Sequence, residues 1–435
     1  METTQSDLII IGAGPGGYEI AAREANAGHK VVLIEKNFLG GTCLNRGCIP
    51  TKSLLASAAV LSTIRAAGSF GINVEGVRAD YAAVADRAAE VVTTLREGIR
   101  ESLAKVELVE GEAEFVAPAV VAVGDKNFSA PKILIATGSA PARLDIPGAE
   151  LAIDSDEFLK LRQMPRTAVV IGGGVIGLEF ATVMAAFGVE VTVIEFCKEI
   201  LPNFDKEIAK RLRSYMSRRG IKFITGAAVK SISEGFTVEC QGKKAVESVS
   251  AELILMAVGR RPVVPKGLDK AGVELTPRGY IAVDARMQTT APGIYAVGDV
   301  NGICLLAHAA SAQAEVALGS DVDLNVIPSV VFTDPECASV GLTEDACKEK
   351  GIDCRTAKSM FTANGKALAS GLSEGLLKLV YAADDGRILG CSIVGAHAGD
   401  LIAEAAVAIS VGLTVETLSH RLIHAHPTLS ELYKI

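Results

Sequence analysis

Two cysteines five residues apart are the residues whose types and spacing most directly suggest chemistry. They lie in Gly-Gly-Thr-Cys43-Leu-Asn-Arg-Gly-Cys48-Ile-Pro-Thr-Lys52. In a regular helix, this spacing separates residues by roughly 7.5 Å of rise and about 140° of rotation. Since a disulfide needs Cα atoms about 4.4–6.8 Å apart, a bond here requires a distorted turn, which Gly47 and Pro50 can supply.

A strained disulfide is readily reduced, and this suits electron exchange better than structural cross-linking. On the cysteines alone, two buried free thiols are an equally good interpretation, because free cysteine is common in protein cores. A zinc site is disfavoured, because no Cys-x-x-Cys and no second pair of ligands accompanies these residues.

A second candidate group closes the chain, in His424-Ala-His426-Pro-Thr428-Leu-Ser-Glu431. One interpretation is a capping box between Thr428 and Glu431, with His426 as a bystander. A metal site built on the two histidines lacks a third ligand nearby in sequence. Alternatively, Glu431 orients the His426 imidazole as an acid/base for a thiol, which at pH 7 is only a few per cent thiolate.

Two stretches share the order strand, glycine-rich turn, helix, strand and acidic residue. Their turns contain Gly12, Gly14 and Gly17 in the first stretch, and Gly172, Gly174, Val175, Ile176 and Gly177 in the second. In such a unit, the first glycine makes the tight turn, the second lets the backbone approach a pyrophosphate, and the third lets helix pack on strand. Glu35 and Glu195 each follow the middle glycine by 21 residues, where a carboxylate can bind an adenosine ribose. The repetition predicts two dinucleotide-binding units.

Composition is that of a globular chain with several domains. The 435 residues are 49% hydrophobic and carry a net charge of −8, which disfavours nucleic acid as the main partner. The longest clean apolar run, residues 167–178, is too short to span a bilayer, so we expect no membrane segment. The N-terminus lacks the basic region of a signal peptide, and nine cysteines without a framework fit a reducing compartment. We therefore expect a cytoplasmic location.

The remaining segments predict the elements that hold these groups. Apolar residues at 84, 88, 91, 92, 95, 99 and 103 have helical spacing and predict a core-packed helix over 82–106. Short strands are predicted over 107–137 and 222–258. Two strand patterns flank Asp384-Asp-Gly386 and predict a hairpin, followed by a helix over 400–411 that Gly412 stops. This last part is predicted to be a separate α+β domain.

Together, these motifs resemble the pyridine nucleotide-disulfide oxidoreductases over nearly the whole chain. Within that family, the similarity is greatest to the members that oxidise dihydrolipoyl groups. The resemblance adds Gly298-Asp299 and Phe332-Thr-Asp-Pro-Glu336 to the motifs already described. It implies an α/β fold with two Rossmann-like domains and a C-terminal α+β dimerisation domain. The expected boundaries are 1–147 for the first part of the FAD-binding domain, 148–276 for the NAD-binding domain, 277–326 for the second part of the FAD-binding domain, and 327–435 for the dimerisation domain.

The resemblance also assigns roles to residues. Cys43 and Cys48 would form the redox-active disulfide, His426 and Glu431 the acid/base pair, and Lys52 would lie beside the flavin and pair with Glu179. No metal is implied. The FAD-binding residues would be Gly12, Gly14, Gly17, Glu35, Lys36, Gly41, Thr42, Lys52, Ala113, Thr137, Gly138, Ser139, Asp299, Leu305, Leu306, Ala307 and His308. The NAD-binding residues would be Gly172, Gly174, Val175, Ile176, Gly177, Glu179, Glu195, Val229 and Gly259.

The implied activity is oxidation of protein-bound dihydrolipoyl groups with reduction of NAD. NAD is favoured over NADP, because the Glu195 carboxylate would repel a 2′-phosphate and no arginine follows it closely. The implied partners are a second copy of the chain and a lipoyl-bearing protein of a 2-oxo acid dehydrogenase, acetoin or glycine-cleavage system, with neither nucleic acid nor membrane. Two alternatives stay open: an NADH-dependent reductase of another disulfide, and a flavin-bearing structural or regulatory subunit with idle cysteines. Arg46, between the cysteines, departs from the usual family pattern and places a cation there.

Overall fold

The computed structural model describes residues 3–242 and 246–435. Contacts divide the chain into two compact units. The first comprises the chain up to Ser53, Ala83–Ala142 and Arg260–Leu324, and the second comprises Leu54–Ala82, Arg143–Gly259 and Asn325–Ile435. The domain boundaries expected from the sequence stay a prediction.

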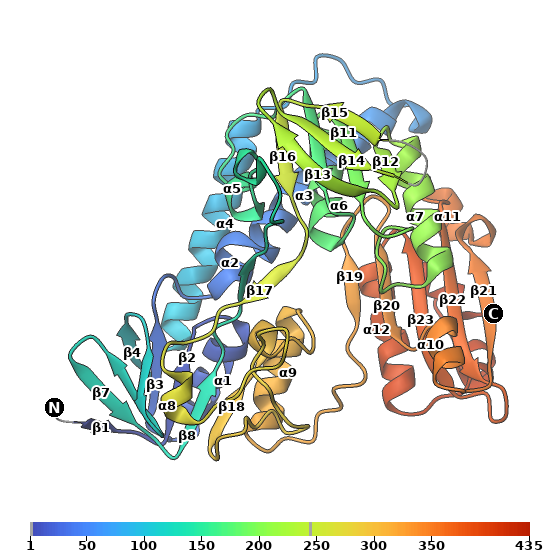
Figure 1. Ribbon diagram of the computed structural model, residues 1–435. Helices are drawn as coiled ribbons and strands as arrows, with labels where there is room; N and C mark the ends of the chain where they lie inside the picture. The colour runs from blue at the N-terminus through green and yellow to red at the C-terminus, as the bar shows by residue number, and fades with distance from the viewer. Residues whose placement is uncertain (1–2, 243–245) are drawn as a thin grey trace. The chain divides into compact units, whose positions relative to one another are not determined.

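A five-stranded parallel sheet forms the centre of the first unit, in the order β18-β8-β2-β3-β4 (Figure 1). All four residues of β2 are buried, as expected of a strand covered on both faces. The order places β2 and β3 side by side with α1 between them in sequence, which confirms the first predicted unit. The bounds are β2 Leu8–Ile11, α1 Pro15–Asn26, β3 Val31–Glu35, β4 Glu107–Glu110, β8 Lys132–Ile135 and β18 Ile294–Ala296.

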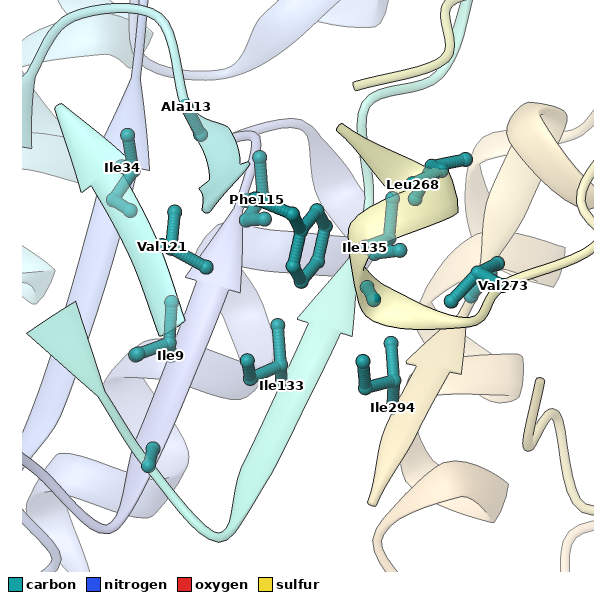
Figure 2. Packing of buried hydrophobic residues seen from close by; sticks show 14 of the residues in the cluster. Ile9, Ile34, Ala113, Phe115, Val121, Ile133, Ile135, Leu268, Val273 and Ile294 are labelled. Atoms are coloured by element: carbon teal, nitrogen blue, oxygen red, sulfur yellow. The ribbon is translucent and has the colours of Figure 1, made fainter. Parts of the chain in front are cut away.

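A second sheet of this unit has the order β1-β7-β6-β5, with strands at Thr3–Gln5, Lys126–Ser129, Val120–Val123 and Glu114–Ala117. Its apolar side chains join those of the central sheet in one core. Figure 2 shows Phe115 and Val121 packed against Ile9, Ile34 and Ile133. A two-stranded ribbon, β9 (Ser139–Pro141) with β17 (Arg260–Pro262), completes the strands. This unit also contains α8 (Leu268–Ala271) and α9 (Ala307–Ala317).

Three helices follow β3. α2 spans Gly41–Arg46, α3 spans Cys48–Ala66 and α4 spans Tyr81–Ser102. The helix predicted over 82–106 is thus confirmed as α4. Ala88 and Val92 are buried as expected, but Leu95 is 44% exposed. The expectation of core packing is wrong for Leu95, because the apolar spacing marks a face of the helix without saying how much of that face is covered.

The second nucleotide unit lies in the other compact unit, as a parallel sheet in the order β12-β11-β10-β16. Its bounds are β10 Thr167–Ile171, α6 Val175–Ala186, β11 Glu190–Glu195, α7 Lys206–Arg218, β12 Lys222–Thr225 and β16 Leu253–Met256. The antiparallel strands β13 (Ala228–Ser233), β14 (Thr237–Gln241) and β15 (Val246–Ser250) lie between β12 and β16 in sequence, and α5 (Ser155–Phe158) precedes β10. The repeat predicted from the glycine spacing is confirmed.

The C-terminal part of the second unit is an antiparallel sheet in the order β19-β20-β23-β22-β21. The predicted hairpin is β22 (Gly375–Ala382) with β23 (Ile388–Gly395), and the predicted helix is α12 (Ala398–Ser410), which packs on β20 and β23. The remaining elements are β19 Ser329–Val331, β20 Cys337–Gly341, α10 Glu344–Glu349, β21 Cys354–Met360, α11 Gly365–Ala369 and a final 3₁₀ turn at Leu429–Tyr433. The predicted α+β fold of this part is therefore confirmed, while its separation as a domain stays a prediction.

By length and composition, the helical stretch Gly41–Phe70 could cross a membrane. One such stretch is weak evidence, because a core helix of a soluble protein passes the same test. It is also interrupted at Gly47 and carries Arg46, Lys52 and Arg65.

Candidate active site

Gly47 separates the helices that carry the two cysteines. α2 ends at Arg46 and α3 begins at Cys48. A side chain at Gly47 would place its Cβ 2.9 Å from the Thr42 carbonyl oxygen and 3.3 Å from the Cys43 Cα atom. This close approach confirms the distorted turn expected from the spacing, while Pro50 lies inside the first turn of α3.

The break brings the two thiols together. Both cysteines are partly buried. The hydrogen bond with Cys48 is the main cause that raises the pKa of the Cys43 thiol, and burial is the second. The positive charge of Lys52 opposes this rise. The hydrogen-bonded pair therefore keeps a proton on Cys43 when both sulfurs are reduced. The thiolate is the attacking species in disulfide exchange, so a base that removes this proton would generate the reactive form.

Both glycine-rich turns fit a dinucleotide. No side chain caps the N-terminus of α1 or of α6, and neither helix has an acidic residue in its first turn. At Gly14 the nearest atom to an added Cβ would lie 4.0 Å away, and at Gly174 nothing lies within 4 Å. At Gly17 and Gly177, by contrast, a Cβ would lie 1.9 and 2.1 Å from the carbonyl oxygens of Gly12 and Gly172. Each unit therefore offers free amides at a helix N-terminus and an open backbone surface for a pyrophosphate.

Glu35 and Glu195 hold the same position in the two units. Glu35 accepts hydrogen bonds from the amides of Ala13 and Asn37, both at 2.8 Å. Glu195 accepts from the amides of Gly173 and Cys197, both at 2.6 Å. Each carboxylate is thus fixed at the end of its strand, next to its glycine turn, with lone pairs left for a ribose.

The other residues expected to bind FAD lie in the first unit. Thr137 donates to the Val263 carbonyl at 2.5 Å, and Ser139 donates to the Asp299 carboxylate. Leu306 is the N-cap of α9, between Leu305 and the helical residues Ala307 and His308. Gly41 and Thr42 begin α2. Ala113 is buried in the core (Figure 2), and the Lys36 ammonium lies 3.7 Å from Glu112.

The remaining residues expected to bind NAD lie in the second unit. Val175, Ile176 and Gly177 form the first turn of α6, Val229 lies in β13, and Gly259 follows β16 with φ of +110°. Glu179 in α6 is 4% exposed and accepts a hydrogen bond from the Phe332 amide at 3.0 Å. Lys52 lies in the first unit and Glu179 in the second, so their pairing stays a prediction.

The structure joins His426 to Glu431. The imidazole Nδ1 lies 3.2 Å and 3.0 Å from the two carboxylate oxygens. Glu431 also accepts from the Thr428 amide at 3.2 Å, as in a capping box. The capping box and the Glu431–His426 contact therefore coexist in one geometry, while the acid/base role of His426 stays a prediction. Hydrogen bonds from Lys434 and the Thr428 amide lower the pKa of Glu431 to about 2, so its carboxylate stays ionised beside a histidine that is 78% exposed.

Sequence reasoning missed several polar groups. Arg260 binds Ser139, and Gln313 accepts hydrogen bonds from the Gly298 amide and from Asn301. Gln313 is fully buried and fixes the turn that carries Asp299. Within residues 3–242 and 246–435, no group of three or more His, Cys, Asp or Glu residues could hold a metal ion.

Fold and site together define a flavoprotein-type disulfide oxidoreductase, and comparison with known proteins agrees. Residues 6–314 match the family described as pyridine nucleotide-disulphide oxidoreductase, and residues 327–434 match the dimerisation domain of that family. The chain belongs to the pyridine nucleotide-disulphide oxidoreductases, which use FAD and NAD(H).

Among individual relatives, the chain is 41% identical to a dihydrolipoyl dehydrogenase of Geobacillus stearothermophilus, over 98% of this chain and 94% of the relative. It is 40% identical to a dihydrolipoyl dehydrogenase of Bacillus subtilis, over 98% and 95% of the two chains. Among solved structures, the HOCl-induced flavoprotein disulfide reductase RclA from Escherichia coli is 29% identical, with a TM-score of 0.86 over 98% of each chain.

Proposed function

We propose that this protein is a dihydrolipoyl dehydrogenase, which oxidises protein-bound dihydrolipoyl groups to lipoyl groups and reduces NAD. The observation that carries the proposal is the hydrogen-bonded Cys43–Cys48 pair at the α2–α3 break. Identity near 40% to curated dihydrolipoyl dehydrogenases supports it. The C-terminal motif would supply His426 as the base, and the two glycine-rich motifs would supply the turns that bind the nucleotides.

The reaction begins with the disulfide form of the pair. One substrate thiol loses its proton to His426, attacks the sulfur of Cys43, and displaces Cys48 as a thiolate. The second substrate thiol then attacks the substrate sulfur of the mixed disulfide and closes the lipoyl ring. Its proton passes to the Cys43 sulfur, which is released. One disulfide is formed and one is reduced, so two electrons and two protons leave the substrate. When bound by the residues of the first unit, FAD would supply the redox chemistry that reoxidises the two cysteines and reduces NAD.

The residues of the chain hold and orient the reactants. The amides at the start of α1 and α6 would bind the pyrophosphates, and Glu35 and Glu195 would bind the riboses of FAD and NAD. Glu431 holds one nitrogen of His426, which leaves the other nitrogen for the thiol proton. Ionised Glu431 stabilises the imidazolium that forms.

We infer that the chain works as a homodimer, supported by the match to a dimerisation domain. In that dimer, His426 of the partner subunit would complete the site around Cys43. A lipoyl-bearing protein would supply the substrate. A cytoplasmic location fits the nine cysteines, because their spacing does not form a disulfide framework.

Replacing single residues tests the function. Cys48→Ser should abolish dihydrolipoamide-dependent NAD reduction, because no disulfide can form. His426→Gln should lower kcat about 10²-fold or more, the contribution typical of a positioned base. Stopped-flow and steady-state absorbance of NADH measure both.

Cys354→Ser is the matched control, since this thiol lies in β21 of the C-terminal sheet. It should keep normal turnover. Normal turnover in both Cys48→Ser and His426→Gln would refute the mechanism. If a wild-type chain with a redox-active pair ignores dihydrolipoamide but reduces other disulfides with NADH, the alternative reductase function is correct.

A further inference from the structure

Arg260 is a mostly buried cation in β17 of the first unit. Its guanidinium donates two hydrogen bonds to one residue, Ser139. Its Nε donates to the Ser139 hydroxyl oxygen at 2.6 Å, and its Nη2 donates to the Ser139 carbonyl oxygen at 2.9 Å. The arginine side chain is only 12% exposed. This two-point attachment fixes the guanidinium, because both hydrogen bonds use its rigid fork.

Ser139 in turn forms a hydrogen bond with Asp299. The buried hydroxyl accepts from Arg260 and donates to the Asp299 Oδ2 atom. Arg260 Nε lies 3.8 Å from the same Oδ2 atom. The charge of Arg260 therefore acts on the carboxylate both through the hydroxyl and directly, and it offsets the cost of holding an anion that is 23% exposed.

The backbone keeps the three residues in register. Arg260 pairs with Pro141, and Pro262 pairs with Ser139 in the β9–β17 ribbon. The Val263 amide donates to the Gly138 carbonyl at 3.0 Å. Asp299 is held from the other side, because the Gly298 amide donates to buried Gln313 at 2.7 Å.

In residues 3–242 and 246–435, one oxygen of the Asp299 carboxylate accepts a hydrogen bond. Within the described part of the chain, hydrogen bonds to its carboxylate reach Oδ2, whereas Oδ1 accepts none. A carboxylate held by one oxygen presents the other at a fixed place. This is the arrangement needed to accept a hydrogen bond from a hydroxyl-bearing ligand.

We propose that Arg260 is a positioning residue for FAD: through Ser139, it holds Asp299 in the orientation that binds the hydroxyl groups of the cofactor. This inference rests on the proposed function, in which Asp299 belongs to the FAD site. It assigns a role to a residue outside the set expected to bind the cofactor.

The test measures FAD affinity directly. Apoprotein of each variant is titrated with FAD, and quenching of flavin fluorescence gives the dissociation constant. Arg260→Gln should weaken FAD binding about tenfold or more, the loss expected of one charge-assisted hydrogen-bond system. Arg260→Lys should rescue it only in part, because an ammonium cannot reproduce the two-point fork.

Arg261→Gln is the matched control. This neighbouring arginine is exposed on the same strand, so its replacement changes the net charge equally and should leave the dissociation constant within about twofold. Thermal unfolding of each apoprotein separates loss of fold from loss of affinity. Asp299→Asn should weaken binding as well, and Arg260→Gln should add little in the Asp299→Asn background, because coupled residues act non-additively.

The outcomes separate this inference from the function. If Asp299→Asn weakens FAD binding but Arg260→Gln does not, the positioning role is refuted while the proposed function stands. Equal effects of Arg260→Gln and Arg261→Gln, or full additivity with Asp299→Asn, also refute it. If the wild-type protein binds no FAD, the proposed function itself fails.

Discussion

At the residue scale, one carboxylate arrangement serves both nucleotide units. Glu35 and Glu195 each accept two backbone amides at the end of the second strand of their unit. Because the Glu195 carboxylate is only 8% exposed, a 2′-phosphate placed there would meet a carboxylate that water screens poorly. We therefore expect the choice between NAD and NADP to depend on this residue.

We predict that Glu195→Ser lowers kcat/KM for NAD and raises the NADP-to-NAD ratio of kcat/KM about tenfold, because the repulsion is removed. Steady-state kinetics with both nucleotides measures the ratio. Glu35→Ser makes the same change in the first unit, where it should weaken FAD binding and leave the ratio unchanged. A ratio that Glu195→Ser does not move would exclude Glu195 as the determinant.

Sequence reasoning reaches residues that are close in the chain. The His426–Glu431 hydrogen bond spans five residues, and the local sequence offered it as one of two interpretations. Arg260 and Ser139 are 121 residues apart, and nothing local distinguishes Arg260 from its neighbour Arg261. Their contact depends on strand pairing, which a single sequence does not specify.

At the element scale, a buried ion pair joins α7 to β22. Lys378 Nζ lies 2.8 Å from Asp205 Oδ2 and 3.1 Å from Glu344 Oε2. Lys378 and Asp205 side chains are each 5% exposed. Asp205 also caps α7 by accepting from the amides of Glu207 and Ile208. The lysine thus connects the helix that follows Glu195 to the C-terminal sheet.

We predict that Lys378→Met lowers the free energy of unfolding by about 3 kcal/mol, because it leaves Asp205 as an unpaired buried charge. Urea unfolding followed by circular dichroism measures the loss. Lys348→Met is the control, since this lysine is exposed and, among the described residues, its ion pair is with Glu344. Its replacement should cost well under about 1 kcal/mol. Equal losses in the two variants would contradict the importance of burial.

The same cluster predicts a pH dependence. Hydrogen bonds from Lys348 and Lys378 lower the pKa of Glu344 to about 2, below an unfolded value of about 4.3. A carboxylate with a lowered pKa stabilises the fold above the unfolded value and loses that contribution as the pH falls through the folded value. Unfolding free energy should therefore decline from about pH 5 to pH 2, and less steeply in Lys378→Met. Parallel slopes would contradict this.

The elements themselves were largely predictable. Glycine turns, the Asp384–Gly386 hairpin turn and the Gly412 stop act through local backbone conformation. The exposure of Leu95 was not predictable, because helical spacing does not report what covers a face. The Lys378–Asp205 pair joins residues 173 positions apart, so its pattern is absent from any local window.

At the scale of the whole molecule, the proposed site needs two subunits. In the homodimer, Cys43 and Cys48 of one subunit would act with His426 of the partner subunit. Neither local motif contains this information, because the contacts in each half of the site join residues of the same motif. The cross-subunit arrangement is therefore a hypothesis that only mixing of subunits can test.

We predict that two inactive variants restore activity when mixed. A dimer of one Cys48→Ser and one His426→Gln subunit has one intact site and one doubly altered site. Random reassociation after mild denaturation should therefore give about one quarter of wild-type turnover. Mixing Cys48→Ser with Cys43→Ser is the control and should give none. No recovery in the first mixture, with hybrid dimers present by native mass spectrometry, would place His426 in the site of its own subunit.

The contact between Gly14 and Gly41 has a practical consequence. A Cβ at Gly41 would lie 2.7 Å from the Gly14 Cα atom, so the phosphate turn and the start of the cysteine-bearing helix support each other. Preparations that lose flavin should also lose order around the two thiols and become open to irreversible oxidation by air. Purification and storage with added FAD and a reductant should therefore preserve the material, and mass spectrometry of stored samples can follow sulfonic acid at Cys43 and Cys48.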